Sequence, residues 1–269
     1  MNYYKFEDMF ADVSYLKERY TGLIECETIG YSVQGRPIVM LRVGCGCINM
    51  FISAGVHGRE SINTGLLVNV ISSYIDTYHN EPEFMKYCFC IIPLVNPDGY
   101  IKALTDPGYS DYKYNANGVD INRDFPSALW KQTETTGSIP ASQPETRAVI
   151  AAFKSHPSIM YVDIHSRGNC VYYYRGVMSG KYNLRQQRMA DILCRYTGYM
   201  AVDPELEVEA GDTGGNTVHY YSEAFGMPAF TIETADDSTG FPMNHNLIER
   251  VYINMRYLPE AMIRCCRYI

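Results

Sequence analysis

Apolar residues recur along this chain with two different spacings. An apolar residue at every third or fourth position is typical of an amphipathic helix. This spacing occurs in 6–20, 61–79, 144–155, 182–197, 214–225 and 246–265. Short continuous apolar runs, which are typical of buried strands, occur in 37–44, 48–55, 87–95, 158–164, 169–175 and 228–233. Strands that are apolar on both faces and alternate with helices predict an α/β fold with a largely parallel sheet covered on both sides.

Polar residues follow several of the predicted strands at the point where each strand ends. His57 and Glu60 come after 48–55, His165 follows 158–164, and Glu233 closes 228–233. Ligands of open α/β sheets bind outside the carboxyl ends of the strands. We therefore expect these four side chains to converge at one edge of the sheet.

Two histidines and one carboxylate form a ligand set that suits catalytic zinc, because the fourth position stays open for water. His57 and Glu60 are three residues apart at the start of a predicted helix, and His165 would complete the set. Taken alone, the local pattern favours a glutamate placed by a helix dipole beside a structural histidine. The presence of Glu233 makes a metal site the better interpretation. A carboxylate at the end of a buried strand is costly unless it faces a cation, a cleft or a nucleophilic water.

The segment 112–126 carries Lys113, Asn122 and Arg123 in a stretch that contains several asparagines, a glycine and a proline. This composition predicts a loop. Such a loop either contributes cations and amides to a site or lies on the surface as a solvated connection. The residues alone leave both readings open.

Composition narrows the class of protein. The 269 residues contain no repeat or long linker, which predicts one domain spanning 1–269. A net charge of −7 argues against nucleic acid as a partner, and no apolar segment approaches the length that spans a bilayer.

The N-terminal segment lacks the basic start and apolar run of a secretory signal, so we expect a cytoplasmic location. The nine cysteines lack zinc-site spacing and are expected to be reduced thiols.

Several motifs, in their order along the chain, resemble those of the zinc carboxypeptidase family, which includes carboxypeptidases A and B. They are HGRE, NPDGY, GVDINRDFP, the histidine after SIMYVDI and the glutamate in PAFTIET. The resemblance extends over roughly 28–260 and implies a three-layer α/β/α fold with a central mixed, largely parallel twisted sheet. The chain looks most similar to bacterial members that act on γ-D-glutamyl-diamino acid links of peptidoglycan peptides.

The resemblance implies roles for the catalytic residues. Glu233 would be the general base and Lys113 would stabilise the oxyanion, in place of the family's arginine. Asp120 would orient His57. One zinc ion would be bound by His57, Glu60 and His165.

The resemblance also implies a substrate site. Asn122 and Arg123 would clamp the terminal carboxylate of the substrate, and Arg59 would help to hold it. Thr217 would form a small polar floor of the side-chain pocket, while Ala210 stands where the digestive enzymes have a covering tyrosine. Arg167 could read a second substrate carboxylate or form a surface ion pair. No role is expected for the remaining histidines, which are His79, His156, His219 and His245.

These observations predict a zinc metallocarboxypeptidase that acts on a peptide with a free C-terminal carboxylate, with a peptidoglycan-derived peptide as the favoured class. The arginine at position 123 favours removal of a terminal residue. The alternatives are a γ-D-glutamyl-L-diamino acid endopeptidase, an inactive zinc-retaining peptide-binding protein, and a hydrolase of another ester or amide. The sequence gives no indication of the oligomeric state.

Overall fold

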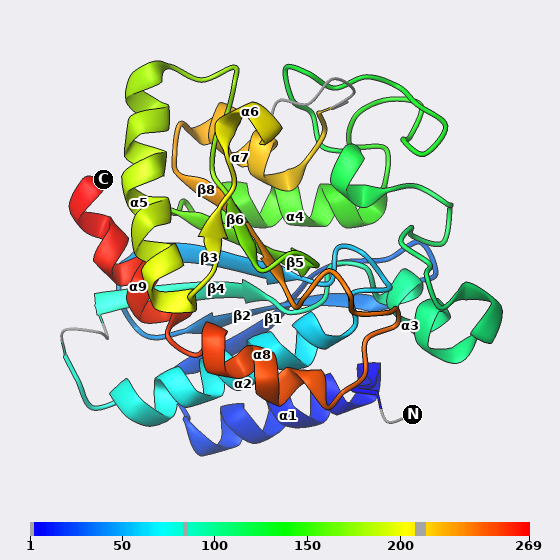
Figure 1. Ribbon diagram of the computed structural model, residues 1–269. Helices are drawn as coiled ribbons and strands as arrows, with labels where there is room; N and C mark the ends of the chain where they lie inside the picture. Colours follow the sequence, from blue (N-terminus) through cyan, green and yellow to red (C-terminus); the bar gives the residue numbers. More distant parts are fainter. Residues whose placement is uncertain (1–2, 83–85, 208–213) are drawn as a thin grey trace.

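The computed structural model describes residues 3–82, 86–207 and 214–269 as helices and strands joined by loops (Figure 1). The helices are α1 (Phe6–Arg19), α2 (Ile62–Tyr78), α3 (Pro97–Thr105), α4 (Pro144–Ser155), α5 (Gly180–Thr197), α6 (Pro204–Glu207), α7 (Thr217–Phe225), α8 (Leu247–Met255) and α9 (Leu258–Cys265). The strands are β1 (Ile24–Tyr31), β2 (Pro37–Val43), β3 (Ile48–Ala54), β4 (Tyr87–Ile92), β5 (Tyr161–Ser166), β6 (Cys170–Tyr172), β7 (Met200–Ala201) and β8 (Ala229–Thr234).

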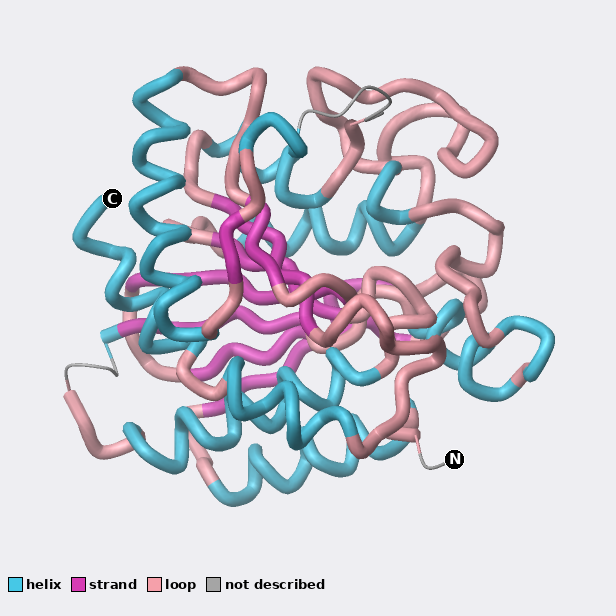
Figure 2. Tube along the Cα trace, in the orientation of Figure 1, coloured by secondary structure: helices cyan, strands magenta, loops and turns pink. Residues whose placement is uncertain are grey.

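The strands form one 8-stranded sheet in the order β1-β2-β4-β3-β5-β8-β6-β7, seen at the centre of Figure 2. The four central strands, β4, β3, β5 and β8, run parallel to one another. Antiparallel pairs join β1 to β2, β2 to β4 and β6 to β8. The sheet is therefore mixed and largely parallel, as the sequence predicts.

Helices cover both faces of the sheet (Figure 1). One apolar core joins a face of the sheet to side chains of α1, α2, α5, α8 and α9. The second core joins the opposite face to α4 and α7, with Phe153 among its fully buried rings. Burial of apolar surface on both faces explains the continuous apolar runs of the central strands.

The structure corrects the predicted elements at several places. The helix α3, the short helix α6 and the short strand β7 were not predicted. The strand β1 was not predicted either, because Ile24–Tyr31 is an antiparallel edge strand with few buried positions and thus lacks a continuous apolar run. The single helix predicted over 246–265 is divided into α8 and α9. Pro259 lies in the first turn of α9, where its missing N–H costs nothing, whereas within a continuous helix it would break a hydrogen bond.

None of the nine cysteines forms a disulfide bond, and several are buried among apolar residues. Cys88 and Cys90 lie side by side along β4 and are fully buried. In the described part of the chain, no helix is both long and apolar enough to cross a membrane.

Candidate metal centre and its pocket

The loop between β3 and α2 carries the first two predicted metal ligands, His57 and Glu60. Gly58, between them, packs against the start of α3. A Cβ at Gly58 would lie 2.3 Å from the carbonyl carbon of Gly99, so only glycine allows this approach. The Asn96 side chain also holds this loop, because its amide donates a hydrogen bond to the carbonyl of Val56 at 3.2 Å. The loop is thus held at the carboxyl end of β3.

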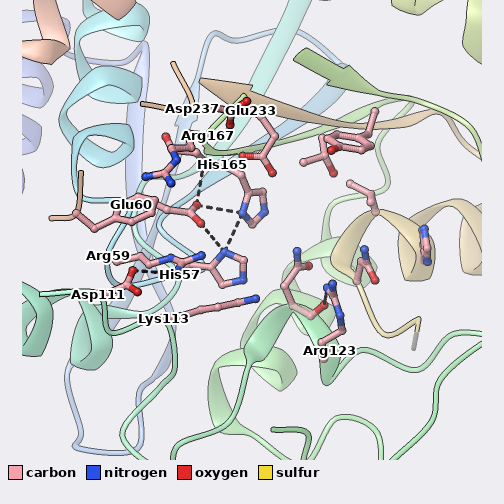
Figure 3. Close-up of a pocket in the computed structure, with 18 of the residues that line it drawn as sticks. His57, Arg59, Glu60, Asp111, Lys113, Arg123, His165, Arg167, Glu233 and Asp237 are labelled. Atoms are coloured by element: carbon pink, nitrogen blue, oxygen red, sulfur yellow. Dashed lines mark hydrogen bonds and ion pairs between the residues drawn. The ribbon is translucent and has the colours of Figure 1, made fainter. Parts of the chain in front are cut away.

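His57, Glu60 and His165 form a buried cluster whose ligand atoms all lie within 4.8 Å of one another (Figure 3). His57 Nδ1 is 2.7 Å from Glu60 Oε1, and His165 Nδ1 is 3.2 Å from Glu60 Oε2. The two Nδ1 atoms are themselves 3.2 Å apart. The residues that the sequence places after two different strands therefore meet at one point.

Buried carboxylates hold the outer nitrogens of both imidazole rings. His57 Nε2 lies 3.2 Å from Asp120 Oδ1, and His165 Nε2 lies 2.9 Å from Asp163 Oδ2. Burial opposes ionisation of these two aspartates, but the adjacent histidines keep the pKa of each below its ordinary value. Asp120 and Asp163 therefore accept hydrogen bonds from the Nε2–H groups.

This arrangement fits a metal cation. A neutral imidazole protonated at Nε2 presents a lone pair at Nδ1. In this cluster the two Nδ1 atoms and the Glu60 carboxylate converge, so either protons or a metal cation must supply positive charge between them. Burial opposes protonation of His165, but Asp163 and Glu60 raise its pKa well above the ordinary value, which shows how strongly the cluster attracts a cation. Histidines that bind metals usually donate their other N–H to a carboxylate or carbonyl in this way. The donor set, two nitrogens and a carboxylate, suits zinc.

Glu233 lies beside His165, because the two residues are register partners on the parallel strands β5 and β8. Its carboxylate lines the pocket, and its Oε2 is buried without a hydrogen-bond partner. Burial raises the pKa of Glu233 to about 8; His165 opposes this shift, while Glu60 and Asp163 add to it. Glu233 is thus a carboxylate with no structural partner at this atom, placed next to the cluster.

A pocket of about 1000 Å³ opens over the cluster and Glu233. Every predicted catalytic, metal-binding and substrate-binding residue except Thr217 lines it. These are His57, Arg59, Glu60, Lys113, Asn122, Arg123, His165 and Glu233, together with Arg167.

Two of the basic side chains in the pocket are paired with acids. Lys113 Nζ lies 2.7 Å from Asp120 Oδ2, so the carboxylate that supports His57 also holds the lysine. Arg59 Nη1 lies 2.9 Å from Asp111 Oδ1, whose side chain is 71% exposed. An ion pair as exposed as the second contributes little to stability, whereas the first is fixed by a buried carboxylate.

Asn122 and Arg123 lie in a short 3-10 helix, Ile121–Arg123, which the Asp120 side chain caps by accepting from Asn122 N at 3.0 Å. Gly215, at φ 78°, packs against the backbone of Arg123 and leaves no room for a Cβ. Arg123 Nη1 donates to the carbonyl of Asn122 at 2.8 Å. Among the described residues, its guanidinium has no carboxylate partner.

Thr217 lies behind the pocket wall and is fully buried. Its backbone N–H donates to Asn122 Oδ1 at 3.0 Å, and its hydroxyl lies within hydrogen-bonding distance of Asn122 Oδ1 and Asp163 Oδ2. The neighbouring residues Val218 and His219 line the pocket instead. Because the Asn122 oxygen is engaged by Thr217, the amide nitrogen is the atom left to donate to a ligand.

The sequence analysis missed several residues that shape the site. His219, which was expected to have no role, lines the pocket, and burial together with Arg175 and Arg123 lowers its pKa to about 3. Asp163 was missed as well, although its position two residues before His165 places both side chains on one face of a strand. Nothing in the sequence pattern pointed to Phe241, which also lines the pocket. Ala210 lies outside the described residues.

Comparisons with known proteins find a family and several similar sequences. A family profile described as zinc carboxypeptidase matches residues 9–257. Mouse carboxypeptidase M is 29% identical over 176 residues, which span 61% of this chain but only 38% of that protein. Gamma-D-glutamyl-L-diamino acid endopeptidase 1 of Lysinibacillus sphaericus is 23% identical over 90% of this chain and 68% of its own length.

Solved structures show the same fold. The structure of bovine thrombin-activatable fibrinolysis inhibitor, in complex with a tick carboxypeptidase inhibitor, matches with a TM-score of 0.84 and 20% identity. The match covers 100% of this chain and 99% of that one. The arrangement of sheet and helices is therefore shared although four residues in five differ.

Proposed function

The chain belongs to the zinc carboxypeptidase family, and on that premise we propose that it is a zinc-dependent metallocarboxypeptidase that hydrolyses the C-terminal amide bond of a peptide. The observation that supports this most directly is a pocket that combines the His57, Glu60 and His165 cluster with Glu233 and with the guanidinium of Arg123, which has no carboxylate partner among the described residues. The proposal treats residues 1–269 as one catalytic domain that binds one zinc ion.

The residues around the cluster have different roles in the proposed hydrolysis. Zinc at this site would supply a Lewis acid that polarises the scissile carbonyl and acidifies a water. Burial raises the pKa of Glu233, but a cation at the cluster would oppose that shift and favour the ionised form. The Glu233 carboxylate then takes a proton from the attacking water and delivers it to the nitrogen of the leaving amine. Lys113, fixed by Asp120, places a positive charge where the carbonyl oxygen becomes negative.

Asn122 and Arg123 are proposed to bind the terminal carboxylate of the substrate. The planar guanidinium of Arg123 can donate two parallel hydrogen bonds to a carboxylate, and Asn122 adds an amide N–H. Thr217 supports this by engaging the oxygen of Asn122 from behind. A substrate bound in this way must end at the residue that contacts Arg123, which favours removal of a terminal residue.

A peptidoglycan-derived peptide is the proposed substrate class. Support comes from the relative in Lysinibacillus sphaericus, whose name describes cleavage next to a γ-D-glutamyl residue, and which aligns over 90% of this chain. The same relative motivates the alternative that the enzyme cuts internally as a γ-D-glutamyl-L-diamino acid endopeptidase. The two activities differ in whether the substrate needs a free C-terminal carboxylate.

Paired peptides that differ only in a C-terminal carboxylate or carboxamide test the proposal. Zinc-loaded enzyme should cleave the free acid with a kcat/KM roughly 10- to 100-fold above that for the amide, because charge-assisted hydrogen bonds are lost with the carboxylate. Arg123→Gln should abolish that difference, and a chelator should abolish cleavage. Arg185→Gln is the control, since Arg185 lies outside this pocket, over the ring of Tyr182. Equal cleavage of acid and amide would favour the endopeptidase.

A further inference from the structure

The pocket contains a second group of basic side chains on the opposite side of the metal cluster from Arg123. Figure 3 shows Arg59 and Arg167 on one side of His57 and Glu60, and Arg123 on the other. Arg59 comes from the loop after β3 and Arg167 from the turn after β5, so the fold brings them together from separate segments.

Phe241 holds both guanidinium groups. The Arg59 Cζ lies 4.6 Å from the centroid of the Phe241 ring, and the Arg167 Cζ lies 4.9 Å from it. Contact with an aromatic ring stabilises a cation while it leaves the N–H groups at the edge of the guanidinium free to donate. The arginine pair, defined as Arg59 and Arg167, is thereby oriented within the pocket wall.

Arg167 keeps most of its hydrogen-bonding capacity. One of its nitrogens donates to the carbonyl of Thr239, and the other N–H groups of the guanidinium are left to donate to a ligand. Asp237 also lines this side of the pocket, but within the described chain no ion pair joins a carboxylate to Arg167. Arg59 has Asp111 as a partner, but that carboxylate is largely exposed and a competing carboxylate can replace it at small cost.

The position of the arginine pair relative to the cluster indicates which half of the substrate the pair would contact. Under the proposed function, on which this inference rests, the scissile amide lies at the cluster and the leaving residue extends toward Arg123. The acyl half then extends the other way, over Phe241 and the arginine pair.

We propose that the arginine pair binds a carboxylate carried by the acyl residue of the scissile bond, and that Arg167 determines specificity for such substrates. Two kinds of residue present this chemistry. One is an α-linked glutamate with its side-chain carboxylate, and the other is a γ-linked glutamate with its free α-carboxylate. Both place a carboxylate a few bonds from the scissile carbonyl, with a second carboxylate at the C-terminus for Arg123.

Four peptides with the same C-terminal residue test the assignment: α-glutamyl, α-glutaminyl, γ-D-glutamyl, and γ-D-glutamyl with its α-carboxylate amidated. Zinc-loaded enzyme should cleave at least one acidic peptide with a kcat/KM roughly 10- to 100-fold above that of its amide partner. If the α-glutamyl pair shows the preference, the bound group is a side-chain carboxylate. If the γ-D-glutamyl pair shows it, the bound group is a free α-carboxylate. Arg167→Gln should reduce the ratio to within about 3-fold.

The control is Arg185→Gln. Arg185 has the same local setting, 4.9 Å over the ring of Tyr182 with a hydrogen bond to the carbonyl of Gly226, but it lies outside the pocket. This variant should keep the wild-type ratio. Equal kcat/KM for acidic and amidated partners in the wild type, or an unchanged ratio in Arg167→Gln, would overturn the assignment.

A binding measurement separates this inference from the proposed function. Dissociation constants of the same four peptides for zinc-loaded Glu233→Gln protein report on the arginine pair without turnover. A tighter Kd for an acidic peptide, lost in the additional variant Arg167→Gln, supports the carboxylate subsite even if wild-type enzyme cleaves none of the peptides. Equal Kd values for acidic and amidated partners contradict it even if cleavage occurs.

Discussion

His57 and His165, 108 residues apart in the sequence, direct the same ring nitrogen toward each other, with their Nδ1 atoms 3.2 Å apart. Each ring is held in this orientation from behind, by Asp120 and Asp163 respectively. Two imidazole lone pairs at that separation repel unless they share a cation. The relationship suits a site that could hold a metal ion, and it makes the two aspartates part of that site.

Loss of either supporting carboxylate should weaken metal binding. Asp163→Asn should lower zinc affinity about 10- to 100-fold, because the amide is a weaker acceptor for the Nε2–H group of His165. Competition with a chromophoric chelator measures this affinity. Asp98→Asn is a matched control, since Asp98 is also buried but accepts from Ser32 and Gln34. Zinc affinity that is unchanged in Asp163→Asn would contradict this role.

Thr217 should act through Asp163 and not through contact with the substrate. Thr217→Val keeps the shape and the backbone N–H that donates to Asn122, but it removes the hydroxyl, whose single proton lies nearest to the Asp163 carboxylate. Because Asp163 holds His165, zinc affinity should fall by up to about 10-fold, while the KM of the zinc-loaded enzyme changes less. Thr217→Ser restores the hydroxyl and should restore the zinc affinity. A changed preference for the C-terminal side chain, with zinc affinity unaltered, would instead indicate that Thr217 forms the pocket floor.

The sequence predicts that His57, Glu60 and His165 lie together because they follow strongly apolar strands, and the structure brings them together. The strands β3 and β5 have continuous buried runs and β8 is mostly buried, so the polar residue that ends each strand is easily recognised. Their convergence follows from parallel pairing, which brings equivalent strand ends to one edge.

The remainder of the site depends on contacts that local patterns do not encode. Whether Thr217 or Val218 faces the pocket depends on the rotation of α7, which the hydrogen bonds of Thr217 to Asn122 and Asp163 fix. Phe241 belongs to a loop, and its place beside the arginine pair comes from distant segments of the chain. The edge strand β1 was missed for the related reason that pairing with β2, and not burial, makes it a strand.

His219 should make the folded protein sensitive to mild acid. The pKa of a histidine in the unfolded chain is about 6.5, whereas burial, Arg175 and Arg123 lower that of folded His219 to about 3. Between these values the unfolded state binds more protons, so the free energy of unfolding falls as the pH decreases below about 6.5. At pH 5 this one group removes at most about 2 kcal/mol.

Urea unfolding at pH 7 and pH 5 measures this effect as a difference between wild type and His219→Gln. The variant should lose less stability than the wild type between the two pH values, and protonation of the metal ligands cancels in the comparison. His156→Gln, a histidine near Glu27 outside the pocket, is the control. Equal losses in wild type and His219→Gln would show that His219 does not account for the acid sensitivity.

Glu233 is proposed to be the base of a zinc-dependent hydrolytic centre, and one variant tests this role most directly. Glu233→Gln should retain one zinc ion per chain, since Glu233 is outside the ligand cluster, and should lose turnover by at least about 100-fold. Mass spectrometry of products from a pool of L-peptides and γ-D-glutamyl peptides, with metal analysis of the same sample, measures both. Zinc-loaded Glu233→Gln protein that cleaves peptides at the wild-type rate would contradict the account.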